Sequence, residues 1–147
     1  METTSKAARQ AREQTLLAGA ASVSISAPAD SEPLGGYWGR TGCGLAPSNG
    51  ADLHAKVLTL SVGVGIPQTT AQGTCFVVLD LVGLNAEGCD RIKRAILETS
   101  QAGTVGLTTE ADIIVCCTHS HTAPQTHADF IGMGHASAQY KNMLVHN

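Results

Sequence analysis

The stretch Thr74-Cys-Phe-Val-Val-Leu-Asp-Leu81 decides the fold, because it is an apolar run broken only by Asp80. Such a run is typical of a strand covered on both faces, as in a parallel sheet. Residues 86–100 then place apolar side chains at helical spacing, and Asn85 is the expected N-cap. Residues 112–117 (Asp-Ile-Ile-Val-Cys-Cys) predict a second buried strand. Strand, helix and strand together predict a βαβ unit with parallel strands.

The segments before this unit extend the predicted sheet. Residues 16–26 alternate small apolar residues and serines, which predicts a first strand. Residues 27–52 are rich in proline and glycine and predict a long loop. Residues 54–62 alternate as a strand with one solvated face, and residues 63–73 resemble a Gly/Thr/Gln-rich connection. The fold class predicted is α/β, with a partial mixed sheet that contains the βαβ unit.

The two ends of the chain predict its domain organisation. Residues 1–15 are a polar leader without a periodic apolar face. A final helix is expected from Ala136, and its pattern reaches Asn147 without a stop signal. Its apolar face would consist of Tyr140, Met143 and Leu144. We therefore expect residues 16–147 to be the N-terminal portion of a larger domain that is incomplete at its C-terminus.

Composition excludes several classes of function. The 147 residues fit one domain, with 43% hydrophobic and 14% charged residues. A net charge of −3 argues against nucleic acid as a partner, because nucleic-acid binding requires a basic surface. No apolar stretch approaches the roughly 20 residues of a membrane-spanning helix. The sequence leaves the oligomeric state open.

The five cysteines are an odd number without CxxC spacing, which disfavours a disulfide framework or a cysteine-type zinc site. Cys75, Cys116 and Cys117 lie in apolar runs, so we expect them to be buried small hydrophobes. Reduced thiols favour a cytoplasmic location. The short apolar stretch near residue 16 imitates a signal peptide, but serines soon interrupt it.

Candidate functional residues follow the second buried strand, in Thr118-His-Ser-His-Thr-Ala-Pro124. In open α/β sheets, ligands bind beyond the carboxyl ends of the strands. His119, His121 and Asp80 are therefore expected at one edge of the sheet. Neutral imidazole is a common zinc ligand, although a His-x-His pair can also be a hydrogen-bonded loop.

The order of these segments resembles the N-terminal catalytic domain of the neutral/alkaline (non-lysosomal) ceramidases. The resemblance includes the Pro33-Leu-Gly-Gly-Tyr37 loop and the segment with Asp80, and it runs from about Leu16 to Asn147. The signature of that family is Thr-His-Thr-His-Ser-Gly-Pro after a strand. This chain keeps the threonine, both histidines and the proline. It departs from the signature at Ser120, Thr122 and Ala123.

The resemblance implies a zinc site in which His119 is a metal ligand and His121 is a catalytic residue that contacts the substrate or transition state. The other ligands of the family, a second histidine, a glutamate and a tyrosine, come later in its chains and match nothing here. Asp80 could orient a histidine or bond loop amides. Tyr37 and Trp38 could form a substrate loop or pack within their own loop. Three later single histidines, His127, His135 and His146, are interpreted as structural or solvated.

The expected function is zinc-dependent hydrolysis of the amide bond of ceramide or a related N-acyl lipid, which yields a sphingoid base and a fatty acid. This activity is expected from a longer chain, so the 147 residues alone should bind zinc weakly and hydrolyse little. The alternative is a non-catalytic domain that keeps the fold and binds a ligand or partner.

Overall fold

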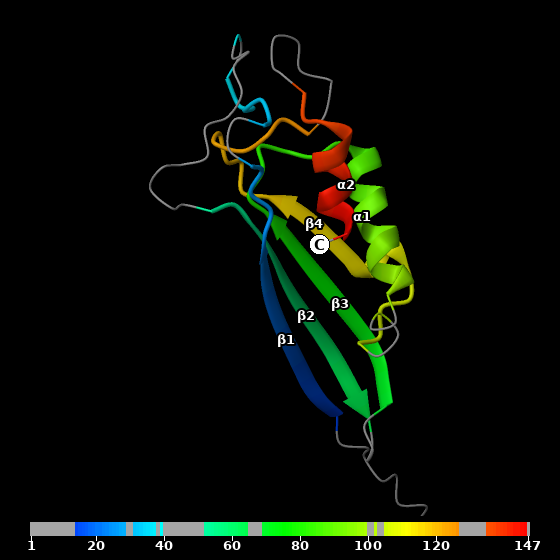
Figure 1. Cartoon of the computed structure of the whole chain (residues 1–147). Helices are drawn as coiled ribbons and strands as arrows, with labels where there is room; N and C mark the ends of the chain where they lie inside the picture. Colours follow the sequence, from blue (N-terminus) through cyan, green and yellow to red (C-terminus); the bar gives the residue numbers. More distant parts are fainter. Residues whose placement is uncertain are drawn as a thin grey trace, which may run out of the picture.

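The computed structural model describes residues 14–28, 31–37, 39, 52–64, 69–99, 102, 105–126 and 135–146. Its elements are β1 (Gln14–Ser24), β2 (His54–Val64), β3 (Thr69–Leu79), α1 (Ala86–Glu98), the 3-10 turn η1 (Glu110–Asp112), β4 (Ile113–Cys117) and α2 (Ala138–His146). The strands form one sheet in the order β1-β2-β3-β4 (Figure 1). The pairs β1–β2 and β2–β3 are antiparallel, whereas β3 and β4 are parallel. The predicted mixed sheet with a βαβ unit is therefore confirmed.

The first half of β3 corrects the prediction that residues 63–73 form a connection. β2 continues to Val64 and β3 begins at Thr69, so the two strands form a long antiparallel hairpin with a bulge at Val62/Gly63. Polar residues join this strand because ladder hydrogen bonds use the backbone, and these side chains need no core. Gly73 is required there, because a Cβ would lie 1.8 Å from the carbonyl oxygen of Val105.

The N-terminal strand differs slightly from its predicted bounds. β1 begins at Gln14, so Gln14 and Thr15 belong to the sheet and not to the leader predicted over residues 1–15. The rest of that leader lies outside the described residues. β1 pairs with β2 along its whole length but is exposed at nearly every position, because it is the edge strand and neither described helix covers it. It ends at Ser24, two residues before the predicted end.

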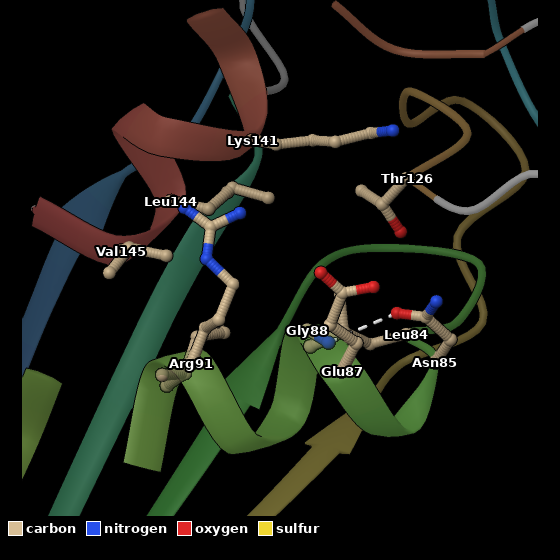
Figure 2. A pocket seen from close by; sticks show the side chains of 10 residues that line it. Leu84, Asn85, Glu87, Gly88, Arg91, Thr126, Lys141, Leu144 and Val145 are labelled. Carbon is tan, nitrogen blue, oxygen red and sulfur yellow. Dashed lines mark hydrogen bonds between the residues drawn. The ribbon is translucent and has the colours of Figure 1, made fainter. Parts of the chain in front are cut away.

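Helix α1 forms at the position that its N-cap residue and the spacing of its apolar residues predict. The side chain of Asn85 accepts a hydrogen bond from the backbone N–H of Gly88 at 3.0 Å, which satisfies one of the free N–H groups at the helix start (Figure 2). Ile92 is buried beneath the helix, and Ile96 packs against the same core. At the other end, the N–H of Thr99 bonds the carbonyl of Ile96 and closes the helix.

Helix α2 begins two residues after the expected Ala136. The hydroxyl of Ser137 accepts a hydrogen bond from the N–H of Tyr140, and the carboxylate of Glu32 accepts one from the N–H of Ser137 at 2.6 Å. Tyr140 is buried, and Met143 and Leu144 pack partly buried against the core, so the predicted apolar face is confirmed. Among the described residues, neither helix is long and apolar enough to cross a membrane.

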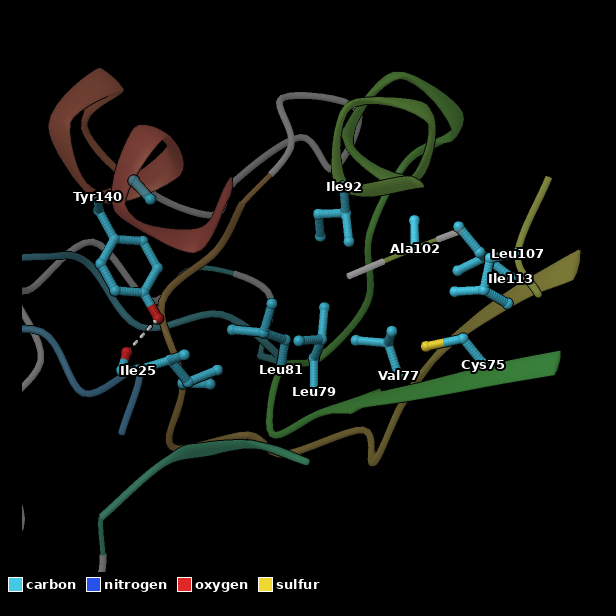
Figure 3. Close-up of a cluster of buried hydrophobic side chains, with 12 residues drawn as sticks. Ile25, Cys75, Val77, Leu79, Leu81, Ile92, Ala102, Leu107, Ile113 and Tyr140 are labelled. Atoms are coloured by element: carbon cyan, nitrogen blue, oxygen red, sulfur yellow. Dashed lines mark hydrogen bonds between the residues drawn. The ribbon is translucent and has the colours of Figure 1, made fainter. Parts of the chain in front are cut away.

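The core lies between the helices and one face of the sheet (Figures 1 and 3). Alternate residues of β3 point into this core, namely Cys75, Val77 and Leu79, and Ile113 joins them from β4. Tyr140 closes one end of this core, and its hydroxyl donates to the carbonyl of Ile25 at 2.9 Å. Burial and the nearby carboxylate of Glu32 raise the pKa of Tyr140.

The opposite face of the sheet corrects the prediction that these strands are covered on both sides. Ile114 on β4 is 45% exposed, which contradicts that prediction, whereas Leu58, 41% exposed, lies on β2, for which one solvated face was predicted. Cys116 is exposed, contrary to the expectation for this cysteine, whereas Cys75 is buried and Cys117 is half-buried. The apolar run predicted burial, but within the described residues the helices lie over one face only.

Candidate functional site

The candidate site begins where β3 and β4 end. Because the strands are parallel, their carboxyl ends meet at one edge, and the two segments that leave them stay hydrogen-bonded. The N–H of Thr118 bonds the carbonyl of Leu79 at 2.9 Å, and the N–H of Ser120 bonds that of Leu81 at 3.1 Å. Asp80 and His119 consequently lie on adjacent segments at the predicted edge of the sheet.

His119 has an exposed side chain whose orientation is fixed by one hydrogen bond. Its Nδ1 atom lies 2.9 Å from the carbonyl oxygen of Val82. A carbonyl only accepts, so Nδ1 carries the hydrogen and the lone pair of the neutral ring is on Nε2. The backbone of His119 has φ +62°, a left-handed conformation that costs a non-glycine residue about 1 kcal/mol. Strain of this kind is concentrated at functional positions.

His121 lies between two other rings. The centroid of its imidazole is 4.8 Å from that of His119 and 4.6 Å from that of Tyr37, and both pairs meet edge to face. Gly36 lies against the same imidazole, because a Cβ added to it would be 2.5 Å from Cγ of His121. The loop that contains Tyr37 therefore contacts His121, and a role of Tyr37 in substrate binding stays a prediction. Trp38, the other predicted loop residue, lies outside the described residues.

The residues that precede Tyr37 are hydrogen-bonded to the segment that follows the two histidines. Pro33 and Gly35 form hydrogen bonds with residues 123–125, and Leu34 forms an isolated β-bridge with Pro124. Glu32, which is 7% exposed, accepts hydrogen bonds from both the backbone and the hydroxyl of Ser137. The Gly35-Gly36 pair permits this close approach, but nothing in the pattern distinguished Glu32 from a solvated loop glutamate.

Asp80 binds the backbone and a hydroxyl group. One carboxylate oxygen accepts from the hydroxyl of Thr118 at 3.1 Å, and the other accepts from the backbone N–H of His54 at 3.0 Å. The ammonium of Lys56 is 4.0 Å from the second oxygen. These contacts agree with the loop-bonding interpretation of Asp80. Orientation of a histidine by Asp80 stays a prediction, and in this geometry it would act through Thr118, the neighbour of His119.

The described residues contain no group of three or more histidine, cysteine, aspartate or glutamate side chains that could hold a metal ion. His135 and His146 are exposed, as interpreted from the sequence, and His127 lies outside the described residues. Cys117 is close to the edge, but burial, aided by Cys89 and Cys116, raises the pKa of its thiol to about 11. The thiolate that would bind a metal is therefore scarce at neutral pH.

Comparison with known proteins gives no relative. A scan against models of protein families finds no match, and a search of curated proteins finds no significant similarity. The residues and the geometry at this edge of the sheet are therefore the basis for a proposed function.

Proposed function

We propose that this edge of the sheet is part of the active site of a zinc-dependent amide hydrolase similar to the neutral/alkaline ceramidases, acting on ceramide or a related N-acyl lipid. The observation that supports the proposal best is the hydrogen bond from Nδ1 of His119 to the carbonyl of Val82. Histidines that bind metal usually donate their other ring N–H to a carbonyl or carboxylate, which fixes the tautomer. The same bond leaves Nε2 of His119 available at an exposed position.

The described residues would supply one of the several ligands that a zinc ion needs. His119 would hold the ion through Nε2, and the other ligands would come from residues outside those described. Zinc bound there would polarise the amide carbonyl and lower the pKa of a bound water toward neutrality. The catalytic zinc sites of hydrolases typically have three protein ligands and one open position.

The neighbouring rings have distinct proposed roles. The imidazole of His121, half-buried beside His119, would donate a hydrogen bond to the substrate amide as its oxygen gains negative charge. Tyr37 is 57% exposed and would present its ring to the apolar part of an N-acyl lipid. Gly36 would keep this loop close enough for both contacts, because any side chain there would meet His121.

A second candidate function is a non-catalytic domain that binds a ligand or partner. It is favoured by the absence, among the described residues, of a group of three metal ligands. A cytoplasmic location is proposed with either function, because the four described cysteines, Cys75, Cys89, Cys116 and Cys117, are all free thiols.

The test measures hydrolysis of a fluorescent N-acyl sphingoid amide by zinc-loaded protein, using the 147-residue chain and any natural form that continues past Asn147. We expect turnover from the longer form and little from the 147 residues. His119→Gln should lower kcat/KM by more than about 100-fold, since second-sphere partners of metal ligands alone are worth 10–100-fold. His135→Gln, an exposed histidine, is the matched control. Full activity of the His119→Gln variant would contradict the proposal.

A further inference from the structure

A second candidate site lies on the helix side of the sheet. A pocket of about 310 Å³ opens between α1 and α2, and none of the residues that line it belongs to the histidine site. Ligand sites for small molecules begin at about 300 Å³, so this pocket matches a small metabolite in size. It is independent of the proposed zinc chemistry.

The charges that line the pocket are of both signs. Figure 2 shows the Glu87 carboxylate and the Arg91 guanidinium pointing from α1 toward α2, while Lys141 extends from α2 toward the segment that carries Thr126. Within the described residues, the salt bridges are Lys56–Asp80 and Arg94–Glu110, so Glu87 and Lys141 are not joined to each other. One Nη atom of Arg91 donates to the side chain of Asn142 at 2.8 Å, which connects the two helices at this point.

Besides the polar residues Asn85 and Thr126, the remaining wall has an apolar part. Leu84 and Ile92 contribute from the side of α1, and Leu144 and Val145 contribute from α2. Water against these four side chains contacts hydrocarbon, so a ligand with an aliphatic group would gain free energy by displacing it. A ligand that fits must therefore combine charged groups with a small apolar group.

We propose that the α1–α2 pocket binds a small zwitterion, specifically a free amino acid with a branched aliphatic side chain. Its carboxylate would face Lys141 and Arg91, its ammonium would face Glu87, and its side chain would lie against the apolar wall. A simple carboxylate or phosphate fits less well, because Glu87 would repel it. A simple amine fits less well for the same reason, since it would meet two cations.

The experiment is isothermal titration calorimetry on the whole 147-residue chain with three probes. L-leucine carries both charges, 4-methylpentanoate lacks the ammonium and 3-methylbutylamine lacks the carboxylate. The variants are Glu87→Gln and Lys141→Gln. Glu98→Gln and Lys93→Gln each remove one charge, negative and positive respectively, from a residue of α1 that does not line the pocket. They serve as matched controls. Circular dichroism melting of each variant checks that the fold is retained.

We expect saturable binding of one leucine per chain, weakened at least about tenfold by either pocket variant and unchanged in the controls. Both analogues should bind at least about tenfold more weakly than leucine, because each leaves one charged side chain of the pocket unmatched. No saturable binding of leucine would overturn the proposal. Equal binding of 4-methylpentanoate, or leucine binding that survives both pocket variants, would also overturn it.

Discussion

Nδ1 of His119 lies 2.9 Å from the carbonyl oxygen of Val82, so the segment after β3 holds the ring of a residue that follows β4. This relationship depends on the parallel pairing of β3 and β4, which brings the two strand ends to one edge. It places the lone pair of the neutral imidazole on Nε2, the atom that our proposal assigns to the metal.

The tautomer of His119 is the first prediction. In protein labelled with nitrogen-15 at histidine, at a pH where the rings are neutral, NMR should find the hydrogen of His119 on Nδ1. His135 is exposed and, within the described residues, its ring has no hydrogen-bond partner, so it provides the control resonance. A hydrogen on Nε2 of His119 would mean that the bond to Val82 does not form in solution.

The contact between Gly36 and His121 gives the second prediction. Gly36 has φ +90° and Gly39 has φ +78°, so alanine strains the backbone at both positions by about 1 kcal/mol. Only at Gly36 would the new Cβ meet the His121 ring, because at Gly39 no described residue lies within 4 Å of that point. Gly36→Ala should therefore lower Tm more than Gly39→Ala and should also shift the NMR resonances of His121. Equal effects of the two substitutions would contradict the close packing of this loop.

The one-sided core gives the third prediction. Ile92 is 6% exposed beneath α1, whereas Ile114 is 45% exposed on the opposite face of the sheet. Ile92→Ala should lower the free energy of unfolding by about 2–5 kcal/mol, because it removes buried methyl groups and leaves a cavity. Ile114→Ala should cost well under half as much in the same urea titration. Equal losses would indicate that the far face is covered in solution.

The carboxylate of Asp112 gives the fourth prediction. Backbone and hydroxyl groups of Thr108 and Thr109 donate to it, and these bonds, the backbone ones first, lower its pKa. A lowered folded-state pKa means that the stabilisation is present above the unfolded value of about 4 and is lost as the pH falls through the folded value. Asp112→Asn should therefore lower Tm at neutral pH, and the gap to the unsubstituted protein should narrow in acid. The control is Asp90→Asn on α1, and a gap independent of pH would contradict this assignment.

Local signals in the sequence predicted the centre of the fold. The apolar residues around Val77, the cap at Asn85 and the spacing around Ile92 all favour the same βαβ unit, and the structure contains it. The first half of β3 was missed because polar side chains such as Gln72 indicate a loop, while backbone pairing with β2 determines the strand. The sequence did not predict that the helices cover only one face of the sheet, because the hydrophobicity of a strand does not show which of its faces another element packs against.

The candidate site was predictable only where topology determines it. Parallel strands require His119 and Asp80 to meet at one edge, and the structure places them there. The positive φ of His119 and the contacts of Glu32 with Ser137 depend on tertiary packing between distant segments, which no pattern of residues encodes locally. The approach of Tyr37 to His121 lies between these cases, since the Gly35-Gly36 pair permits close packing but does not identify the partner.

A zinc titration followed by histidine nitrogen-15 NMR tests the central proposal most directly. We predict that Zn²⁺ shifts the resonances of Nε2 of His119 and of the His121 ring before it shifts those of His54, His135 or His146. We also predict weak binding, because a full set of ligands is needed for high affinity. His119→Gln should remove these early shifts while His135→Gln leaves them unchanged. Shifts that spread equally over all the histidines, or that persist in the His119→Gln variant, would contradict a zinc ligand at His119.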